Sequence, residues 1–345
     1  MQATVVIPVL NEAPNLLRLT ELLLAQQNVE LEILFVDGGS SDQSQALLEG
    51  ITEANDNVRW CSSSPGRGIQ LNTGAGQATH ETLVLLHADS HIEDNALLSQ
   101  GLMHFDANCQ RAGTRHLAGH FGMRFLREAP TPGKGWFFFE AKTHLNRQDC
   151  INGDQGWILD KTYLEQLGYF DTQLGYLEDL RLARQIHAEH AWMTLPGLVY
   201  TSARRFEAEG LRARGILNAF IKCFDDIGFH EYFDAAADAY REQQDSDRLH
   251  LRPFCRLAFN LSLGSGAGYG IKRWYQTGRY INRNAWQLAF LLDCRRCEGT
   301  PADVELTWTG RYDRYIAWLI TSPPAGLITG LLTMVWVASM LVTED

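Results

Sequence analysis

Residues 5–12 read Val-Val-Ile-Pro-Val-Leu-Asn-Glu, an aliphatic run that ends in an amide and a carboxylate. Residues 31–36 form a second run of this kind, which leads into Asp-Gly-Gly-Ser-Ser-Asp at 37–42. Residues 83–86 form another, which ends at His-Ala-Asp at 87–89. Short, continuous apolar runs are typical of strands that are buried on both faces of a parallel sheet.

Helical patterns separate these runs. Leu16, Leu19 and Leu23 fall on one helical face, and residues 68–78 predict another helix after a strand at 58–61. Further along, we expect a strand at 119–125, an aromatic helix at 136–139 and a helix from Glu178. Alternation of strands and helices predicts an α/β fold with a mixed, mostly parallel central sheet. Ligands of such folds bind at the carboxyl ends of the strands, where the polar clusters lie.

The composition excludes some classes of function. The chain has 345 residues and a formal net charge of −11, with 45% hydrophobic residues. This balance argues against a protein that coats nucleic acid, because such proteins neutralise phosphates with excess Lys and Arg. The seven cysteines are an odd number without framework spacing, which fits a reducing compartment. We interpret Cys294-x-x-Cys297 as incidental, since no second pair accompanies it.

The residue composition divides the chain into three parts. We expect a catalytic domain at 1–229, a helical extension at 230–314 and a hydrophobic C-terminal segment at 315–343 that carries no charged residue. Its apolar run of 18 residues, 325–342, would form a helix of roughly 27 Å, close to the ~30 Å of a bilayer core. Arg311 and Arg314 precede it and would keep the catalytic domain cytoplasmic, at the inner membrane. The alternative is a helix packed on its own protein or on a partner.

The N-terminus begins directly with a strand pattern. We therefore expect a cytoplasmic catalytic domain without a leader.

Two of the polar clusters carry acids at strand ends. Asp37 could meet a ribose hydroxyl or the edge of a base, and Asp89 could hold a divalent cation that bridges two phosphates, with His87 as a second ligand. Either cluster taken alone is more typical of a turn that caps the next helix.

Two other clusters lie at predicted helix starts. Arg67 could pair with a phosphate, which the helix N-terminus also favours, although an exposed loop arginine is the simpler reading. Glu178 and Asp179 precede an apolar helical face, so Asp179 could hold a general base beside an acceptor hydroxyl. Acids are also common in first turns because they complement the helix dipole.

The order of the clusters is more specific than any one of them. The segments 5–12, 36–40, 85–89, 152–156 (Asn-Gly-Asp-Gln-Gly) and 177–179 (Leu-Glu-Asp), in this order, resemble glycosyltransferase family 2. More narrowly, they resemble a bacterial subgroup of that family associated with radical-enzyme gene neighbourhoods. The resemblance covers about residues 1–225 and implies a Rossmann-like nucleotide-diphospho-sugar transferase fold of the GT-A type, followed here by a helical C-terminal extension.

The resemblance also implies roles for single residues. Glu12 and Asp37 would help to hold the nucleoside, with Pro8 and Asn11 in the same donor site. Asp89 matches the metal-binding aspartate of the Asp-x-Asp motif, and Asp179 matches the catalytic base, with Glu178 beside it. Asp154 and Gln155 would shape the acceptor or pyrophosphate side. The sequence departs from the family at Gly38, where many relatives have a second Asp, and at His87, which replaces the first Asp of Asp-x-Asp.

We therefore expect an inverting, metal-assisted glycosyltransferase. It would take a sugar from a nucleotide-diphosphate donor, use Mn²⁺ or Mg²⁺, and act on an acceptor hydroxyl that an envelope or lipid-linked glycan would supply. One alternative is a nucleotidylyltransferase, which would usually need a Gly-rich, basic loop where residues 8–12 stand. The other is a non-catalytic nucleotide-sugar-binding membrane protein.

Overall fold

The computed structural model describes residues 1–128, 133–173, 177–241, 243, 248–264 and 266–342. The chain forms two compact units, the first comprising residues 1–126 and 139–202 and the second residues 127–138 and 203–345. Residues 203–229, which the sequence predicts with the catalytic domain, thus fold with the later helices. The functional boundary at residue 229 stays a prediction.

The first unit contains one seven-stranded sheet with the order β3-β2-β1-β4-β6-β5-β7. Of its neighbouring pairs, only those that involve β6 are antiparallel, so the expectation of a mixed, mostly parallel sheet is confirmed. The strands are β1 (Gln2–Val9), β2 (Glu30–Asp37), β3 (Val58–Ser62), β4 (Thr82–Leu85), β5 (Ala118–Leu126), β6 (Trp157–Asp160) and β7 (Trp192–Ser202).

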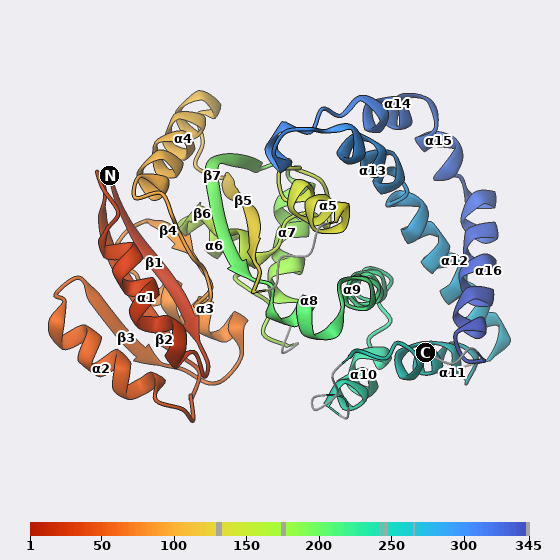
Figure 1. Cartoon of the computed structure of the whole chain (residues 1–345), viewed down its shortest axis with the longest axis horizontal. Helices are drawn as coiled ribbons and strands as arrows, with labels where there is room; N and C mark the ends of the chain where they lie inside the picture. Colours follow the sequence, from red (N-terminus) through yellow and green to blue (C-terminus); the bar gives the residue numbers. More distant parts are fainter. Residues whose placement is uncertain (129–132, 174–176, 242, 244–247, 265, 343–345) are drawn as a thin grey trace. The chain divides into compact units, whose positions relative to one another are not determined.

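Helices cover both faces of this sheet (Figure 1). One apolar core lies under α1 (Ala13–Leu24), α2 (Ser44–Ala54) and α4 (Leu97–Ala112). The other lies under α3 (Arg67–Gln77), α6 (Lys161–Gln166) and α7 (Glu178–Ala188).

Side chains of β1 alternate between the two cores. Val5, Ile7 and Val9 enter the first core and Val6 the second, and all four are fully buried. Burial of each such side chain contributes about 1.5–3 kcal/mol of stability. The apolar run at the start of the sequence is continuous because helices cover both faces of this strand.

Strand β6 enters the sheet in the opposite direction to its neighbours. Its first residue, Trp157, pairs with Leu85 at the end of β4. The short helical turn η1 (Gly153–Gln155) precedes Trp157, so this turn lies at the rim where β1, β2 and β4 end.

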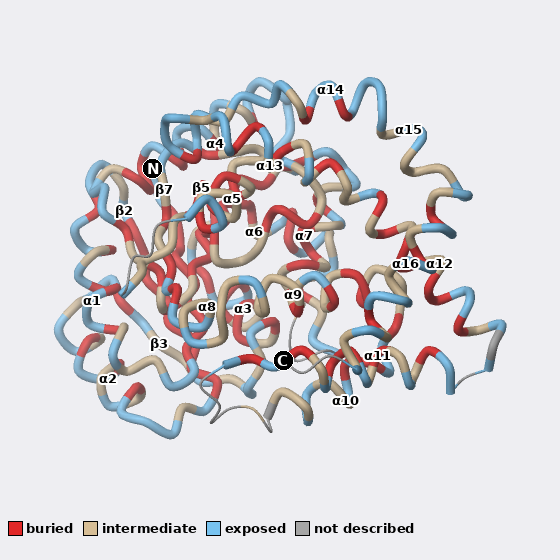
Figure 2. Tube along the Cα trace, turned by 45° about the vertical axis from the view of Figure 1, so that its right-hand side comes forward, coloured by how far each residue is buried: buried red, intermediate tan, exposed pale blue. Residues whose placement is uncertain are grey.

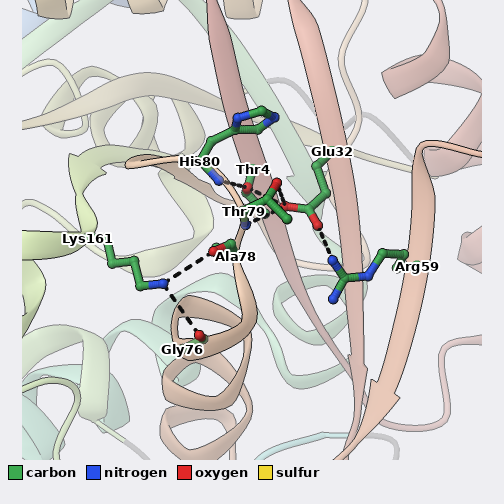
Figure 3. A network of polar contacts seen from close by, with 8 residues as sticks. All are labelled: Thr4, Glu32, Arg59, Gly76, Ala78, Thr79, His80 and Lys161. Atoms are coloured by element: carbon green, nitrogen blue, oxygen red, sulfur yellow. Dashed lines mark hydrogen bonds and ion pairs between the residues drawn. The ribbon is translucent and has the colours of Figure 1, made fainter.

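A polar network closes the opposite rim (Figure 3). The buried Glu32 carboxylate accepts hydrogen bonds from Thr4 Oγ1 (2.6 Å), Thr79 N (2.9 Å) and Thr79 Oγ1 (2.7 Å), and it pairs with Arg59 at 2.6 Å. Burial raises the pKa of Glu32, but these hydrogen bonds and Arg59 outweigh it and hold that pKa below its ordinary value. Lys161 donates to the carbonyls of Gly76 and Ala78 at the end of α3.

The described part of the second unit is helical, so the expected helical extension is confirmed. Helix α5 (Lys134–Lys142) begins in it and ends in the first unit. The remaining helices are α8 (Arg204–Glu209), α9 (Leu211–Asp226), α10 (Glu231–Arg241), α11 (Arg252–Gly264), α12 (Ala267–Arg283), α13 (Trp286–Arg296), η2 (Pro301–Asp303), α14 (Thr307–Tyr315), α15 (Ala317–Ile320) and α16 (Pro323–Ser339). Among the described residues, none of the helices combines the length and the apolar character needed to cross a membrane.

Candidate active site

Asn11 joins the loops that follow β1 and β2. Its backbone has a φ of 57°, in the left-handed region that asparagine tolerates better than most residues. The Asn11 side-chain oxygen accepts hydrogen bonds from Ser41 N (2.8 Å) and Asp42 N (3.3 Å), while its own N–H donates to Ser40 Oγ (2.9 Å). Asn11 therefore holds the two loops together at the carboxyl rim of the sheet.

Asp37 lies inside this pair of loops. Its side chain is fully buried and accepts hydrogen bonds from Gly39 N (3.0 Å), Ser40 N (3.1 Å) and Gln45 Nε2 (2.7 Å). Burial raises the pKa of Asp37, but these hydrogen bonds outweigh it and keep that pKa below its ordinary value. Asp37 therefore stabilises the loop that follows β2 by accepting hydrogen bonds from its backbone.

The other two residues expected near the nucleoside lie on either side of Asn11. Glu12 is partly exposed, and its carboxylate accepts a hydrogen bond from Asn15 Nδ2 at 2.6 Å. Pro8 is buried in β1, opposite Val36. Of the carboxylates at 12 and 37, the one at 12 is therefore the more accessible.

Helix α3 brings Arg67 to the same rim. The buried Gln70 amide donates to the carbonyls of Val9 (2.7 Å) and Val36 (2.8 Å), which are at or next to the last residues of β1 and β2. A side chain at Gly74 would overlap Val6, so this glycine lets α3 pack directly on the sheet. The sequence shows Gln70 only as one polar residue of a helix, and its anchoring role emerges from the structure.

Arg67 pairs with Glu178, the first residue of α7, at 3.3 Å. The Glu178 side chain is only 1% exposed, and its Oε1 atom has no hydrogen-bond partner. Burial, together with the neighbouring Asp179, raises the pKa of Glu178 despite the attraction of Arg67. A carboxyl group that is buried and incompletely hydrogen-bonded is costly for the fold, and such groups concentrate at functional sites.

His87 and Asp154 form a second pair, with 2.9 Å between Nδ1 and Oδ1. Burial and the charge of Arg67 lower the pKa of His87, but Asp154 and Asp89 outweigh them and raise that pKa above its ordinary value. The strand end at 87–89 and the turn η1 therefore meet, as the antiparallel entry of β6 requires.

Asp179 lies on the other side of the same turn. Its carboxylate accepts hydrogen bonds from Gly153 N (2.8 Å) and Leu180 N (2.7 Å). A Cβ atom at Gly153 would stand 2.8 Å from His87 Nε2 and 3.3 Å from Asp179 Oδ2. Gly153 is thus a spacer between these two side chains. The sequence indicates this role only by placing a glycine beside Asp154.

The acids expected at the site gather around Arg67. Its guanidinium interacts electrostatically with Glu178, Asp179, Asp154 and Asp89. Asp89 also accepts a long hydrogen bond, 3.4 Å, from Thr201 at the end of β7. Four separate segments of the sequence therefore contribute charged groups to one place at the carboxyl rim, and α3 connects this place to the Asp37 loop.

Gln155 is fully buried beneath the turn. Its amide nitrogen donates to the carbonyl of Thr143 (2.9 Å) and lies 3.0 Å from His120 Nδ1, while its oxygen accepts from Asn152 N (2.8 Å). These contacts leave Gln155 with protein partners on both ends of the amide. In this structure it supports the turn that carries Gly153 and Asp154.

The site has few protein ligands for a cation. Within the described ranges, no group of three or more His, Cys, Asp or Glu side chains is placed to hold a metal ion. The Asp89 carboxylate, with its single long bond to Thr201, is the more available of the two expected ligands, because His87 Nδ1 is engaged by Asp154. A cation here would take most of its ligands from phosphate oxygens and water, as Mg²⁺ commonly does.

Comparison with known proteins agrees with this geometry. The model of glycosyl transferase family 2 matches residues 4–168. This part of the chain, a little under half of it, is therefore similar to glycosyltransferase family 2. It contains the rim loops, Arg67, His87, Asp89 and Asp154, while Asp179 follows it within the same compact unit.

The domain is also similar to individual proteins. An uncharacterized glycosyltransferase of Nostoc sp. (strain PCC 7120) is 34% identical over 91 residues, which are 26% of this chain and 28% of that relative. The match thus spans little more than a quarter of either protein.

Two solved structures resemble the chain over most of its length. Staphylococcus aureus TarS 1–349 in complex with UDP is 17% identical, with a TM-score of 0.48 over 91% of this chain and 92% of that one. A mannosyltransferase of Pyrobaculum calidifontis in complex with GDP-Man and Mn²⁺ is 18% identical, with a TM-score of 0.47 over 97% and 87%.

Proposed function

We propose that the protein is an inverting glycosyltransferase that moves a sugar from a nucleotide-diphosphate donor to an acceptor hydroxyl. The observation that carries the proposal is the gathering of Asp89, Asp154 and Asp179 around Arg67 at the carboxyl rim of a domain similar to family 2. Ligands of open α/β sheets bind at this rim.

Asp179 would act as the general base. Two backbone N–H groups, of Gly153 and Leu180, fix its carboxylate, and this orientation suits proton transfer from a hydroxyl placed beside it. The acceptor oxygen would attack the anomeric carbon as its proton passes to Asp179 and the nucleoside diphosphate departs from the opposite face. Glu178 would act through Arg67, as a positioning residue.

The leaving diphosphate needs positive charge. Arg67, at the start of α3, can supply it together with the N–H groups of the helix N-terminus. A divalent cation, Mn²⁺ or Mg²⁺, would be held by Asp89, with His87 beside it, and would neutralise charge on the leaving phosphates. The complex of the Pyrobaculum mannosyltransferase with GDP-Man and Mn²⁺ is a reason to test Mn²⁺ first.

Glu12, Asn11 and the Ser40–Ser41 backbone would hold the nucleoside, with Pro8 and Asp37 shaping the loops from inside. Asp154 and the buried Gln155 would set the acceptor side through the turn η1. We further propose an envelope or lipid-linked acceptor and a cytoplasmic catalytic domain held at the inner membrane through the C-terminal segment. No nucleic acid is involved in the proposed reaction.

The test is a thermal-shift screen of nucleoside diphosphates and nucleotide sugars with Mn²⁺, with Mg²⁺ and with chelator, followed by transfer assays with the sugars that bind. A ligand of the folded state raises the unfolding midpoint by mass action. We expect a nucleoside diphosphate to raise the midpoint only with a cation, and Asp89→Ala to abolish that shift. A protein that binds no nucleoside diphosphate under any of these conditions would contradict the proposal.

A further inference from the structure

Helix α16 has two different faces. Gly326, Gly330 and Val337 are buried on the inner one. A side chain at Gly278 of α12 would overlap the Gly326 carbonyl, and one at Gly330 would overlap the carbonyl of Trp274, so the backbones of the two helices are in contact. Glycines four residues apart are the spacing by which helices associate closely in lipid.

The outer face is apolar as well. Along α16, the side chains of Ile328, Leu332 and Val335 are 59%, 65% and 61% exposed, and they follow one another at helical spacing. In α15, Trp318 is 71% exposed. We call the exposed apolar side chains of these two helices the C-terminal apolar face; it consists of Trp318, Leu319, Leu327, Ile328, Leu331, Leu332, Val335 and Trp336.

Figure 2 shows parts of α15 and of α16 in the colour of exposed residues. A helix that packs on its own protein normally turns a polar face to water. Contiguous exposed apolar surface of this kind marks a site of interaction with protein or membrane.

A groove adjoins this face between α12 and α16. It has a volume of about 600 Å³ and is lined by Gly268, Ile271, Lys272, Tyr275, Pro323, Pro324 and Leu327. Lys272, which is exposed, is the one charged residue among these. A groove with apolar walls and an ammonium group at its edge matches an acyl chain with a phosphate at its head.

The charge around the face differs from that of the chain as a whole. The whole chain has a formal net charge of −11, whereas residues 267–345 contain eight Lys and Arg against seven Asp and Glu. Aromatic rings accompany several of these cations: the guanidinium of Arg314 lies 5.8 Å from the centre of the Tyr315 ring, and that of Arg311 lies 5.0 Å from Trp308. Basic and aromatic residues beside an apolar face are the pattern of helices that bind anionic membrane surfaces.

We propose that the C-terminal apolar face docks on the surface of an anionic lipid bilayer, with α16 parallel to the membrane plane and one lipid chain in the groove beside Lys272. The parallel orientation follows from the packing of α16, since its inner face is covered by α12 and only its outer face is free to meet lipid. The proposal deepens the membrane contact proposed above, but it does not depend on glycosyl transfer.

A second copy of the chain is a less suitable occupant than lipid. Two identical faces would set like cations such as Lys272, Arg311 and Arg314 near one another, whereas anionic headgroups complement these cations.

The test is flotation of the full chain with vesicles of phosphatidylcholine alone and of phosphatidylcholine mixed with phosphatidylglycerol. We expect at least tenfold tighter binding to the anionic vesicles. The double variant Ile328→Glu with Leu332→Glu should lose binding at least tenfold, while Met103→Glu should bind as the wild type does. Met103 is a matched control because it is 55% exposed on α4, in the first unit.

A second variant tests the charge. Lys272→Glu with Arg314→Glu should abolish the preference for anionic vesicles and leave the apolar face intact. Thermal unfolding of each variant and its sedimentation without lipid complete the experiment, and we expect wild-type midpoints and a sedimentation coefficient unchanged by Ile328→Glu with Leu332→Glu. Absence of flotation with either vesicle would overturn the proposal, and so would a wild-type dimer that this double variant dissociates. Because vesicle binding needs no donor sugar, failure here is separate from failure of the proposed transfer reaction.

Discussion

The two rims of the sheet each bury a glutamate, and the two are treated in opposite ways. At the amino rim, Glu32 accepts hydrogen bonds from Thr4 and Thr79 and pairs with Arg59, and its pKa is lowered. At the carboxyl rim, Glu178 pairs with Arg67 at 3.3 Å, has an oxygen without a hydrogen-bond partner, and has a raised pKa. A carboxylate that the protein satisfies fully serves stability, and one that it leaves incompletely satisfied belongs to a place where charge is needed.

The largest loss of turnover should come from a substitution at the carboxyl rim. Asp179→Asn keeps the shape of the side chain but removes its capacity to take a proton, so we expect turnover to fall by about 10²–10⁴-fold while donor binding persists. The measurement is the initial rate at saturating donor, with binding followed by calorimetry. Asp56→Asn, at an exposed acid in a turn, is the control and should change neither. Near-normal turnover of Asp179→Asn would remove Asp179 as the base.

The next largest loss of turnover should come from a substitution of Gly153, the spacer in the turn η1. In Gly153→Ala the new methyl group would press on His87 and Asp179, since it would stand 2.8 Å and 3.3 Å from their nearest atoms. Displacing a reacting group by about 1 Å can cost roughly 100-fold in rate, so we expect a loss of one to two orders of magnitude. The unfolding midpoint should change little. Gly76→Ala is the matched control, because a Cβ atom there meets nothing within 4 Å.

A substitution at the amino rim should lower the free energy of unfolding and leave turnover unchanged. In Glu32→Gln the amide oxygen can replace Oε2, which accepts all three bonds from Thr4 and Thr79, but the amide nitrogen then replaces Oε1 opposite Arg59. The ion pair with Arg59 is lost, which costs about 1 kcal/mol. Urea unfolding should detect this loss, whereas turnover per folded molecule should match the wild type. A Glu32→Gln protein of normal stability but impaired turnover would reverse the assignment of the two rims.

The smallest effect is a difference in pH dependence. The folded-state pKa of Glu32 is lowered, so its stabilisation is present above the unfolded-state value near 4.5 and is lost as the pH falls through the folded-state pKa. The pKa of Glu178 is raised, so its contribution is fully present below that unfolded-state value and is lost as the pH rises through the folded-state pKa.

Unfolding free energies measured from pH 3 to 7 check this difference. Glu32→Gln should flatten the loss of stability on acidification, and Glu178→Gln should flatten the loss on the alkaline side of that range. If both variants changed the profile in the same direction, the two glutamates would not differ as described.

Much of the first unit could be predicted from sequence, because its strands are long apolar runs. The runs at 5–9, 31–36 and 83–86 correspond to β1, β2 and β4, and α7 begins at Glu178 as expected. The positions of the acids at the carboxyl rim could be predicted for the same reason, since each follows a recognisable strand or lies at the start of an amphipathic helix, whereas their catalytic roles stay predictions.

Other features depend on partners distant in the sequence. The four residues of β6 are too few for a periodic signal, and their direction is decided by β4 and β5 on either side. The burial of Asp37 and Gln155 could not be predicted either, because a polar residue in a motif looks the same whether it faces a ligand or a backbone carbonyl. Their expected contacts with the donor stay predictions.

The reversed strand β6 also determines the geometry of the candidate active site through its register in the sheet. Trp157 and Leu159 point into one core and Ile158 into the other, so a slip of β6 by one residue would drive an indole ring into a layer shaped for isoleucine. The same slip would carry the turn η1 along with it and part Asp154 from His87. The size of the Trp157 side chain, which lies in the core, therefore helps to keep the proposed catalytic groups aligned.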